Sequence, residues 1–244
     1  INADRRSQGL TDVAWDTLAA QVGTAHAREM ADNGYFSHWN LQGVGPDIRY
    51  ALAGGADSVW ENLFLYRYQD DSGRGAPIND WPQVIRDAQA ELMKSPGHRQ
   101  NILDAAHTHV GIGIAYNPRT GDVRVAQEFV KRYGTIETWP RQVSVGGAIE
   151  LKGSVQSALT NLSADIAYEP FPQPTTSEQL ATFPTTYQSP AVSFAALQPI
   201  MNGNRWSIAT RLDHEGKTGY YHIRLWGQIR DADTMIADIV IRVQ

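Results

Sequence analysis

The sequence predicts an α+β chain in which a region of helices and strands is followed by an all-β region. As far as Tyr133, apolar residues recur at three- to four-residue steps, which is typical of helices with one buried face. Beyond Gly134, short segments that alternate apolar and polar residues dominate, with turn residues between them. A length of 244 residues with 42% hydrophobic residues supports two modest domains. We expect these domains at residues 1–134 and 135–244.

Three helices are predicted in the first domain. The first begins near Trp15 and ends near Gly34, because glycine readily adopts the left-handed conformation that stops a helix. The second begins at Asp80, whose carboxylate is a good N-cap. The third begins at Ser95, where a hydroxyl cap precedes a proline whose missing N–H costs nothing at that position.

Strands complete both predicted domains. His109–Tyr116 and Asp122–Lys131 flank the turn sequence NPRTG, so they are predicted to form a hairpin. In the second domain, alternating segments predict a small antiparallel β-sandwich, which could be an immunoglobulin-like spacer or adhesion domain. These segments are residues 147–155, 162–170, 205–212, 219–229 and 235–243. The Pro-, Thr- and Ser-rich stretch from Glu169 to about Pro190 is predicted to run over a surface without forming a helix.

Composition excludes several classes of function. The chain has no cysteine, which excludes thiol nucleophiles, thiolate metal sites and disulfides. A net charge of −5 without a Lys- or Arg-rich block gives no support for nucleic acid as a partner. No apolar run approaches the roughly 20 residues of a membrane helix. The sequence has no basic and apolar leader, so we expect that any signal peptide has been removed or was never part of it, and the first residue, Ile1, suggests a mature chain. The oligomeric state is not predicted.

Candidate functional residues lie in three short segments of the first domain. His38 stands in YFSHWN, Glu61 and Asn62 in VWENLF, and His98 in SPGHRQNIL. His98 falls in the first turn of a predicted helix, where the helix dipole disfavours its protonation. Each residue alone has an ordinary structural interpretation as a hydrogen-bonded packing residue. The same holds for His26, which we assign to packing on the first helix.

The order of the segments HAREM, FSH, ENL, SPGHRQNIL, HVGIGIA and AQEF resembles the CAP superfamily of cysteine-rich secretory, antigen 5 and pathogenesis-related proteins. The resemblance is greatest to its cysteine-free bacterial branch and covers about residues 2–134. It implies an α-β-α sandwich, an extracellular or cell-surface location, and a cleft with two histidines and two acidic residues. By position, the histidines fall on His38 and His98 and one acid on Glu61, whereas Ser95 stands where many members carry the second acid.

The resemblance leads to three alternative functions. Two neutral imidazoles can bind Zn²⁺ or another divalent cation weakly, with Glu61 and Asn62 in supporting positions. The favoured function is a non-catalytic binding module for a small-molecule, peptide or glycan ligand. A metal-dependent hydrolase of peptides or cell-wall material, with Glu61 as the catalytic residue, is the second, although no HExxH helix is present. The third is a purely structural cluster of His38, Glu61 and His98.

Aromatic residues in the second domain allow two interpretations. Trp206, Tyr220, Tyr221 and Trp226 could line an exposed face that stacks on sugar rings, as in a carbohydrate-binding domain. The favoured interpretation is that they fill the core of the sheet. The exposure of Trp226 distinguishes the two.

Overall fold

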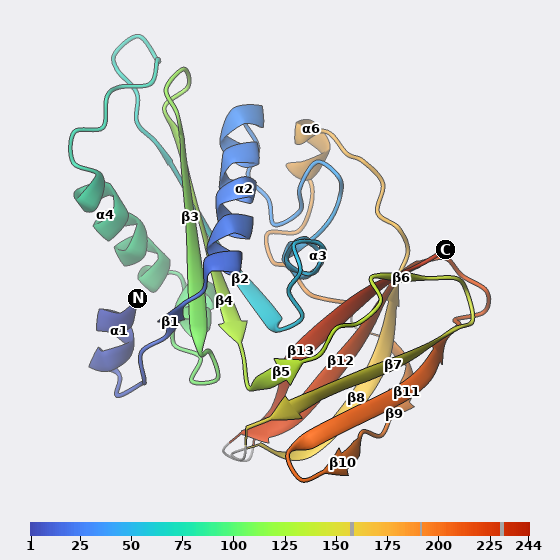
Figure 1. The fold of residues 1–244 in the computed structure, drawn as a ribbon. Coiled ribbons are helices and arrows are strands. Elements are labelled where there is room, and N and C mark those ends of the chain that lie inside the picture. The colour runs from blue at the N-terminus through green and yellow to red at the C-terminus, as the bar shows by residue number, and fades with distance from the viewer. Residues whose placement is uncertain (157–158, 191, 230–231) are drawn as a thin grey trace. The chain divides into compact units, whose positions relative to one another are not determined.

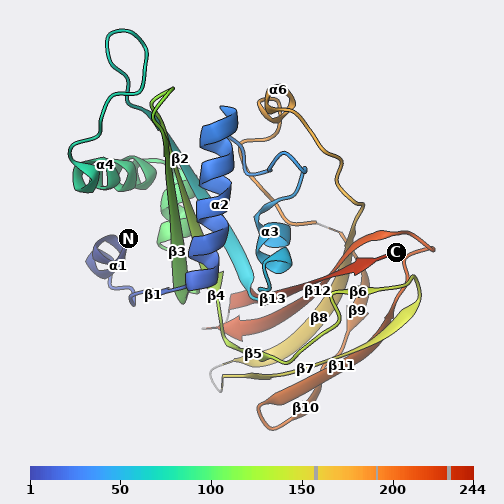
Figure 2. The same cartoon turned by 45° about the horizontal axis from the view of Figure 1, so that its top comes forward.

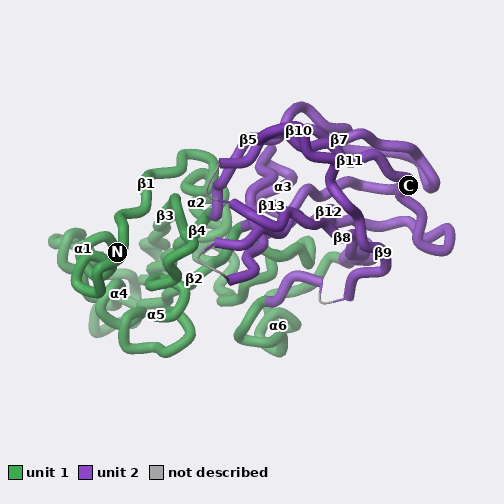
Figure 3. The backbone as a smooth tube through the Cα atoms, turned by 90° about the horizontal axis from the view of Figure 1, so that it is seen from below, with its two compact units in different colours: residues 1–46, 59–130, 174–187 green, residues 47–58, 131–173, 188–244 purple. Residues whose placement is uncertain are grey.

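The computed structural model describes residues 1–244 apart from 157–158, 191 and 230–231. The chain forms two compact units, and each draws on separate stretches of sequence (Figure 3). Unit 1 comprises residues 1–46, 59–130 and 174–187; unit 2 comprises residues 47–58, 131–173 and 188–244. Helices and strands are both present, so the α+β class is confirmed. The predicted domain boundary at residue 134 stays a prediction.

Unit 1 is built on a four-stranded sheet with the strand order β1-β3-β4-β2. Its strands are β1 (Ala14–Trp15), β2 (Ser58–Arg67), β3 (His109–Asn117) and β4 (Asp122–Lys131). β3 and β4 form the predicted antiparallel hairpin, with Asn117 opposite Asp122 next to the turn. The turn sequence NPRTG therefore connects β3 to β4 in the register that was expected for a hairpin.

Helices contact both faces of this sheet (Figures 1 and 2). The helices of unit 1 are α1 (Asn2–Ser7), α2 (Thr17–Asn33), α4 (Trp81–Lys94), α5 (Pro96–Ile102) and α6 (Ser177–Leu180). Val125 of β4 packs against Ala88 of α4. The next residue, Ala126, packs against Met30 of α2. Because successive side chains of a strand point to opposite faces, α2 and α4 lie on opposite sides of the sheet.

Two glycines of β3 allow α2 to lie directly on the sheet. A Cβ atom added to Gly111 would lie 2.0 Å from the backbone nitrogen of Ala20. One added to Gly113 would lie 2.1 Å from the carbonyl carbon of Gly23. No side chain fits into that space, so only glycine permits this helix-to-strand distance.

The helix ends agree with the predicted caps in all but two details. Asp16 accepts a hydrogen bond from the first turn of α2, and Gly34 ends the helix with φ 71°. Trp15 instead belongs to β1 and is 60% exposed, so the predicted start was too early. Asp80 caps α4 as predicted. Ser95 occupies the N-cap position of α5, but its side chain makes no capping hydrogen bond, so the expected hydroxyl cap is wrong.

The Pro- and Thr-rich stretch runs largely over the surface as predicted, but it contains a helix, which was not predicted. Its residues 174–187 belong to unit 1 and include the short helix α6. Thr176 and Gln179 form a capping box at its start. Leu180 is 1% exposed and joins the core cluster that contains Met30 of α2. The stretch therefore carries a core residue, which its polar composition concealed.

Unit 2 contains two sheets and the short helix α3 (Pro46–Leu52). A four-stranded sheet has the order β10-β11-β7-β5, and a five-stranded sheet has the order β6-β13-β12-β8-β9. Their strands are β5 (Gly134–Ile136), β6 (Gln142–Val143), β7 (Gly147–Val155), β8 (Thr160–Glu169), β9 (Ser193–Leu197), β10 (Ile200–Asn202), β11 (Arg205–Leu212), β12 (Gly219–Ile229) and β13 (Ala232–Val243). Each of the five predicted strands overlaps one of these.

One hydrophobic cluster is shared by both sheets of unit 2. The four-stranded sheet contributes Leu151 and Ile208 to this cluster. The five-stranded sheet contributes Ile166, Ile223 and Ile239. Burying so many branched side chains is the main source of stability for this unit.

Most of the aromatic residues that the sequence analysis singled out in unit 2 are buried. Trp206 and Tyr221 belong to the shared cluster, and Tyr220 is buried as well. Trp226 is only half-buried. The packing interpretation therefore holds for Trp206 and Tyr221, whereas Tyr220 is buried outside this cluster, and these three do not form an exposed strip for sugar rings. Within the described part of the chain, no helix is long and apolar enough to span a bilayer.

Candidate functional site

The predicted site residues come from three elements of unit 1. His38 lies in the loop that follows α2, Glu61 lies in the middle of β2, and His98 lies in the first turn of α5. His38 is 7% exposed, and the side chain of Glu61 is completely buried.

His38 and Glu61 are directly bonded. The Nδ1 atom of His38 lies 2.7 Å from Oε1 of Glu61. Since a carboxylate can only accept a hydrogen bond, Nδ1 carries the hydrogen atom. The lone pair of the ring is therefore on Nε2, and the bond fixes the orientation of the ring.

His26 is a neighbour of Glu61 that the sequence did not indicate. It is 1% exposed, as expected for a packing residue of α2. Its Nε2 atom lies 2.9 Å from the carbonyl oxygen of Ser37, so Nε2 donates, and 4.0 Å from Oε2 of Glu61. Glu61 is thus placed beside two imidazoles. The only signal in the sequence was a histidine on the apolar face of a helix, which is too common to predict such a role.

His98 is electrostatically coupled to His38. Burial and the charge of His38 both lower the pKa of His98 below its usual value of 6.5. His98 is therefore a neutral imidazole at neutral pH, the form that binds a metal ion.

Asn62 holds the start of α5 in place. Its Nδ2 atom donates to the backbone oxygen of His98 at 3.1 Å and to Oε1 of Gln127 at 3.3 Å. Its Oδ1 atom accepts a hydrogen bond from Asn101 at 3.0 Å. Asn62 is 2% exposed, so these bonds are shielded from water. The Glu-Asn pair of β2 therefore orients His38 with its first residue and positions the backbone of His98 with its second.

Neither Ser95 nor Glu91, one helical turn before it, supplies a second acid at this site. Ser95 is half-buried at the junction of α4 and α5, where its backbone oxygen accepts from Arg99. The Glu91 side chain is 54% exposed, and its Oε1 atom lies 2.6 Å from Nζ of Lys94. Glu91 therefore forms an ion pair with Lys94 at the surface.

His38 and His98 are the two imidazoles that the sequence predicts as donors at this site. Among the described residues, His38, Glu61 and His98 are not a group whose donor atoms all lie within 4.8 Å of one another. Asp47, His222 and Asp238 of unit 2 are such a group, and the sequence analysis did not identify them. A cavity of about 250 Å³ also lies elsewhere in unit 1, lined in part by Phe64 and Tyr66, and none of the predicted site residues lines it.

Comparison with known proteins identifies the family. The model of the cysteine-rich secretory protein (CAP) family matches residues 1–130, just over half of the chain. The chain belongs to this family. The resemblance seen in the sequence is thereby confirmed, although this member has no cysteine.

The curated relatives are bacterial proteins of unassigned function. The "uncharacterized membrane protein YlbC" of Bacillus subtilis is 29% identical over 134 residues, which are 54% of this chain and 32% of the relative. The "uncharacterized protein YkwD" of the same organism is 28% identical over 113 residues, 46% of this chain and 38% of the relative. The chain spans about a third of the length of these relatives.

Two solved structures are similar over the same share of the chain. An extracellular protein containing an SCP domain from Bacillus anthracis matches with 26% identity and a TM-score of 0.40, covering 54% of this chain and 37% of that one. An outer surface protein of Borrelia burgdorferi matches with 19% identity and a TM-score of 0.40, covering 54% of this chain and 86% of that one.

Proposed function

We propose that this CAP protein is an extracellular or cell-surface binding module that holds a divalent cation, Zn²⁺ above all, between His38 and His98. The observation that carries the proposal is the 2.7 Å bond between His38 and the buried Glu61. Carboxylates that orient a ligating imidazole are typical of zinc sites.

The chemistry of the donors fits such an ion. Glu61 holds the proton of His38 on Nδ1 and leaves Nε2 to coordinate. His98 is neutral because its pKa is lowered. When bound, the ion offers its remaining positions to water or to an oxygen of a ligand. With two protein nitrogens the affinity is modest.

A binding role is favoured over catalysis by the contacts of Glu61. Its carboxylate is bonded to His38 and lies beside His26, so it is used for orientation and is poorly placed to take a proton from water. A small-molecule, peptide or glycan ligand with an oxygen donor would complete the coordination. The extracellular location rests on membership of a secretory protein family.

We also infer the layered architecture from the packing. The contacts of α2 and α4 with opposite faces of the unit 1 sheet support an α-β-α sandwich. The cluster shared by the two sheets of unit 2 supports a β-sandwich.

The proposal is tested by removing metal with a chelator, adding Zn²⁺, and then measuring the zinc bound per chain in the wild type, in His38→Ala/His98→Ala and in the control His109→Ala. His109 lies at the start of β3 and is half-buried, so it controls for the loss of an imidazole. We expect the double variant to bind one ion fewer than both the wild type and the control. If all three proteins bind the same amount of zinc per chain, the proposal is wrong, and His38, Glu61 and His98 form a purely structural cluster.

A further inference from the structure

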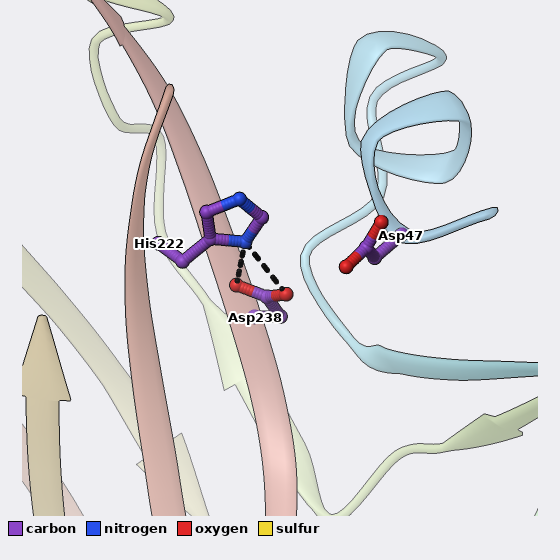
Figure 4. Close-up of side chains that lie close together, drawn as sticks. All are labelled: Asp47, His222 and Asp238. Carbon is purple, nitrogen blue, oxygen red and sulfur yellow. Dashed lines mark hydrogen bonds and ion pairs between the residues drawn. The ribbon is translucent and has the colours of Figure 1, made fainter. Parts of the chain in front are cut away.

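Unit 2 contains a buried group of acidic and imidazole side chains that the function above does not use. His222 of β12 and Asp238 of β13 lie on adjacent strands, and Asp47 faces them from the first turn of α3 (Figure 4). The exposures of the three residues are 0%, 3% and 5%.

The group lies on the face of the five-stranded sheet away from the hydrophobic cluster. Tyr221 and Ile223 point into that cluster, so His222 between them points to the other face. Residues 56–57 lie beside β13, since the carbonyl oxygen of Ala56 accepts a hydrogen bond from the backbone N–H of Asp238 at 2.9 Å and Asp57 bridges to Ala237.

The distances within the group are those of ligands around one ion. A donor atom from each of the three residues lies within 4.8 Å of the other two. Nδ1 of His222 is 3.1 Å from Oδ1 and 3.0 Å from Oδ2 of Asp238. Both are ordinary hydrogen-bond distances, and they place the imidazole nitrogen and the carboxylate as neighbouring donors.

The carboxyl groups around His222 outnumber its single positive charge. Burial lowers the pKa of His222, but the charge of Asp238 and its hydrogen bond outweigh burial and raise that pKa to about 9. Nε2 of His222 is buried without a hydrogen-bond partner among the described residues, and it lies 3.8 Å from Oε2 of Glu169. Burial raises the pKa of Glu169 to about 7, and the charges of Asp47 and Asp238 act in the same direction while His222 opposes them. One imidazole thus faces three carboxyl groups, an arrangement that a divalent cation would balance.

We propose that Asp47, His222 and Asp238 bind a divalent transition-metal ion. One imidazole nitrogen with carboxylate oxygens is a donor set for Zn²⁺ or Mn²⁺ and is a poorer one for Mg²⁺. The ion connects α3 to β12 and β13, so it fastens residues 47–58 to the sheet. This site is separate from the one at His38 and does not depend on it.

The test counts zinc in the full-length His38→Ala/His98→Ala variant, which lacks the other proposed site. After treatment with chelator, addition of Zn²⁺ and dialysis, we expect one ion per chain by atomic emission. We expect none after further substitution of Asp47→Asn. Asp233→Asn is the matched control, because Asp233 lies on the same strand as Asp238 but is exposed and should leave zinc unchanged.

A thermal measurement guards against effects of the substitution on folding. Zn²⁺ should raise the melting temperature of the His38→Ala/His98→Ala variant, because it binds only the folded chain, and Asp47→Asn should abolish the rise. Absence of zinc from the folded double variant would overturn the site, as would zinc retained after Asp47→Asn. The wild type and the double variant binding the same amount of zinc would instead count against the His38 site.

Discussion

Replacing Glu61 with glutamine should weaken zinc binding although Glu61 is not proposed as a ligand. The Glu61 side chain is buried and accepts a hydrogen bond from Nδ1 of His38 at 2.7 Å. Glutamine can still accept this bond through its amide oxygen but has no charge. The bond therefore changes from a charge-assisted one to a neutral one, which is about half as strong.

The size of the effect follows from the role of the bond. Loss of an outer-shell partner of a metal-bound histidine typically lowers metal affinity by about 10- to 100-fold. Since Glu61→Gln keeps the acceptor, we expect about 10-fold, equivalent to about 1.4 kcal/mol. Glu61→Ala removes the acceptor as well, and we expect about 100-fold, or about 2.8 kcal/mol.

The assay is zinc competition against a chromophoric chelator, carried out in the Asp47→Asn background so that unit 2 does not contribute. Glu91→Gln is the matched control, because Glu91 is exposed and pairs with Lys94. We expect the control to bind zinc as the parent does. An unchanged affinity in Glu61→Gln and Glu61→Ala would refute the argument that Glu61 orients His38 for the metal.

Three further predictions concern folding and pH. Leu180→Ala should lower the free energy of unfolding by about 2–5 kcal/mol in urea titrations, whereas Val192→Ala, at a residue 77% exposed, should change it by less than about 0.5 kcal/mol. Gly113→Ala should cost about 1–3 kcal/mol or more by forcing α2 off the sheet, whereas Gly97→Ala meets nothing within 4 Å and should be tolerated. The pKa of His98 is lowered in the folded state, first by burial, so the unfolded chain takes up its proton first as the pH falls. In the presence of chelator, His98→Gln should therefore lose less stability than the wild type between about pH 7.5 and about pH 5.5, and an equal loss would contradict the cause given for the shift.

Local signals in the sequence were sufficient for most of the secondary structure. The NPRTG turn fixed the β3–β4 hairpin, and Asp80 marked the start of α4, because each depends on a few neighbouring residues. The site residues followed from a family pattern, and the structure adds the bond between His38 and Glu61.

Contacts between distant parts of the chain were not predictable in this way. Leu180 stands in a polar stretch and is buried by α2 and β4, which the local composition does not reveal. His222 stands among aromatic residues of a strand, and its acidic neighbours come from the next strand and from a segment far earlier in the chain. Such groups are assembled by the register of the sheet and by the path of the chain.

The central claim is most directly tested by the anomalous scattering of crystals grown with Zn²⁺ and measured at the zinc absorption edge. The account predicts an anomalous peak within coordination distance of Nε2 of His38 and of a ring nitrogen of His98, with Glu61 still bonded to Nδ1. Crystals with zinc at other sites and none at these two imidazoles would contradict it.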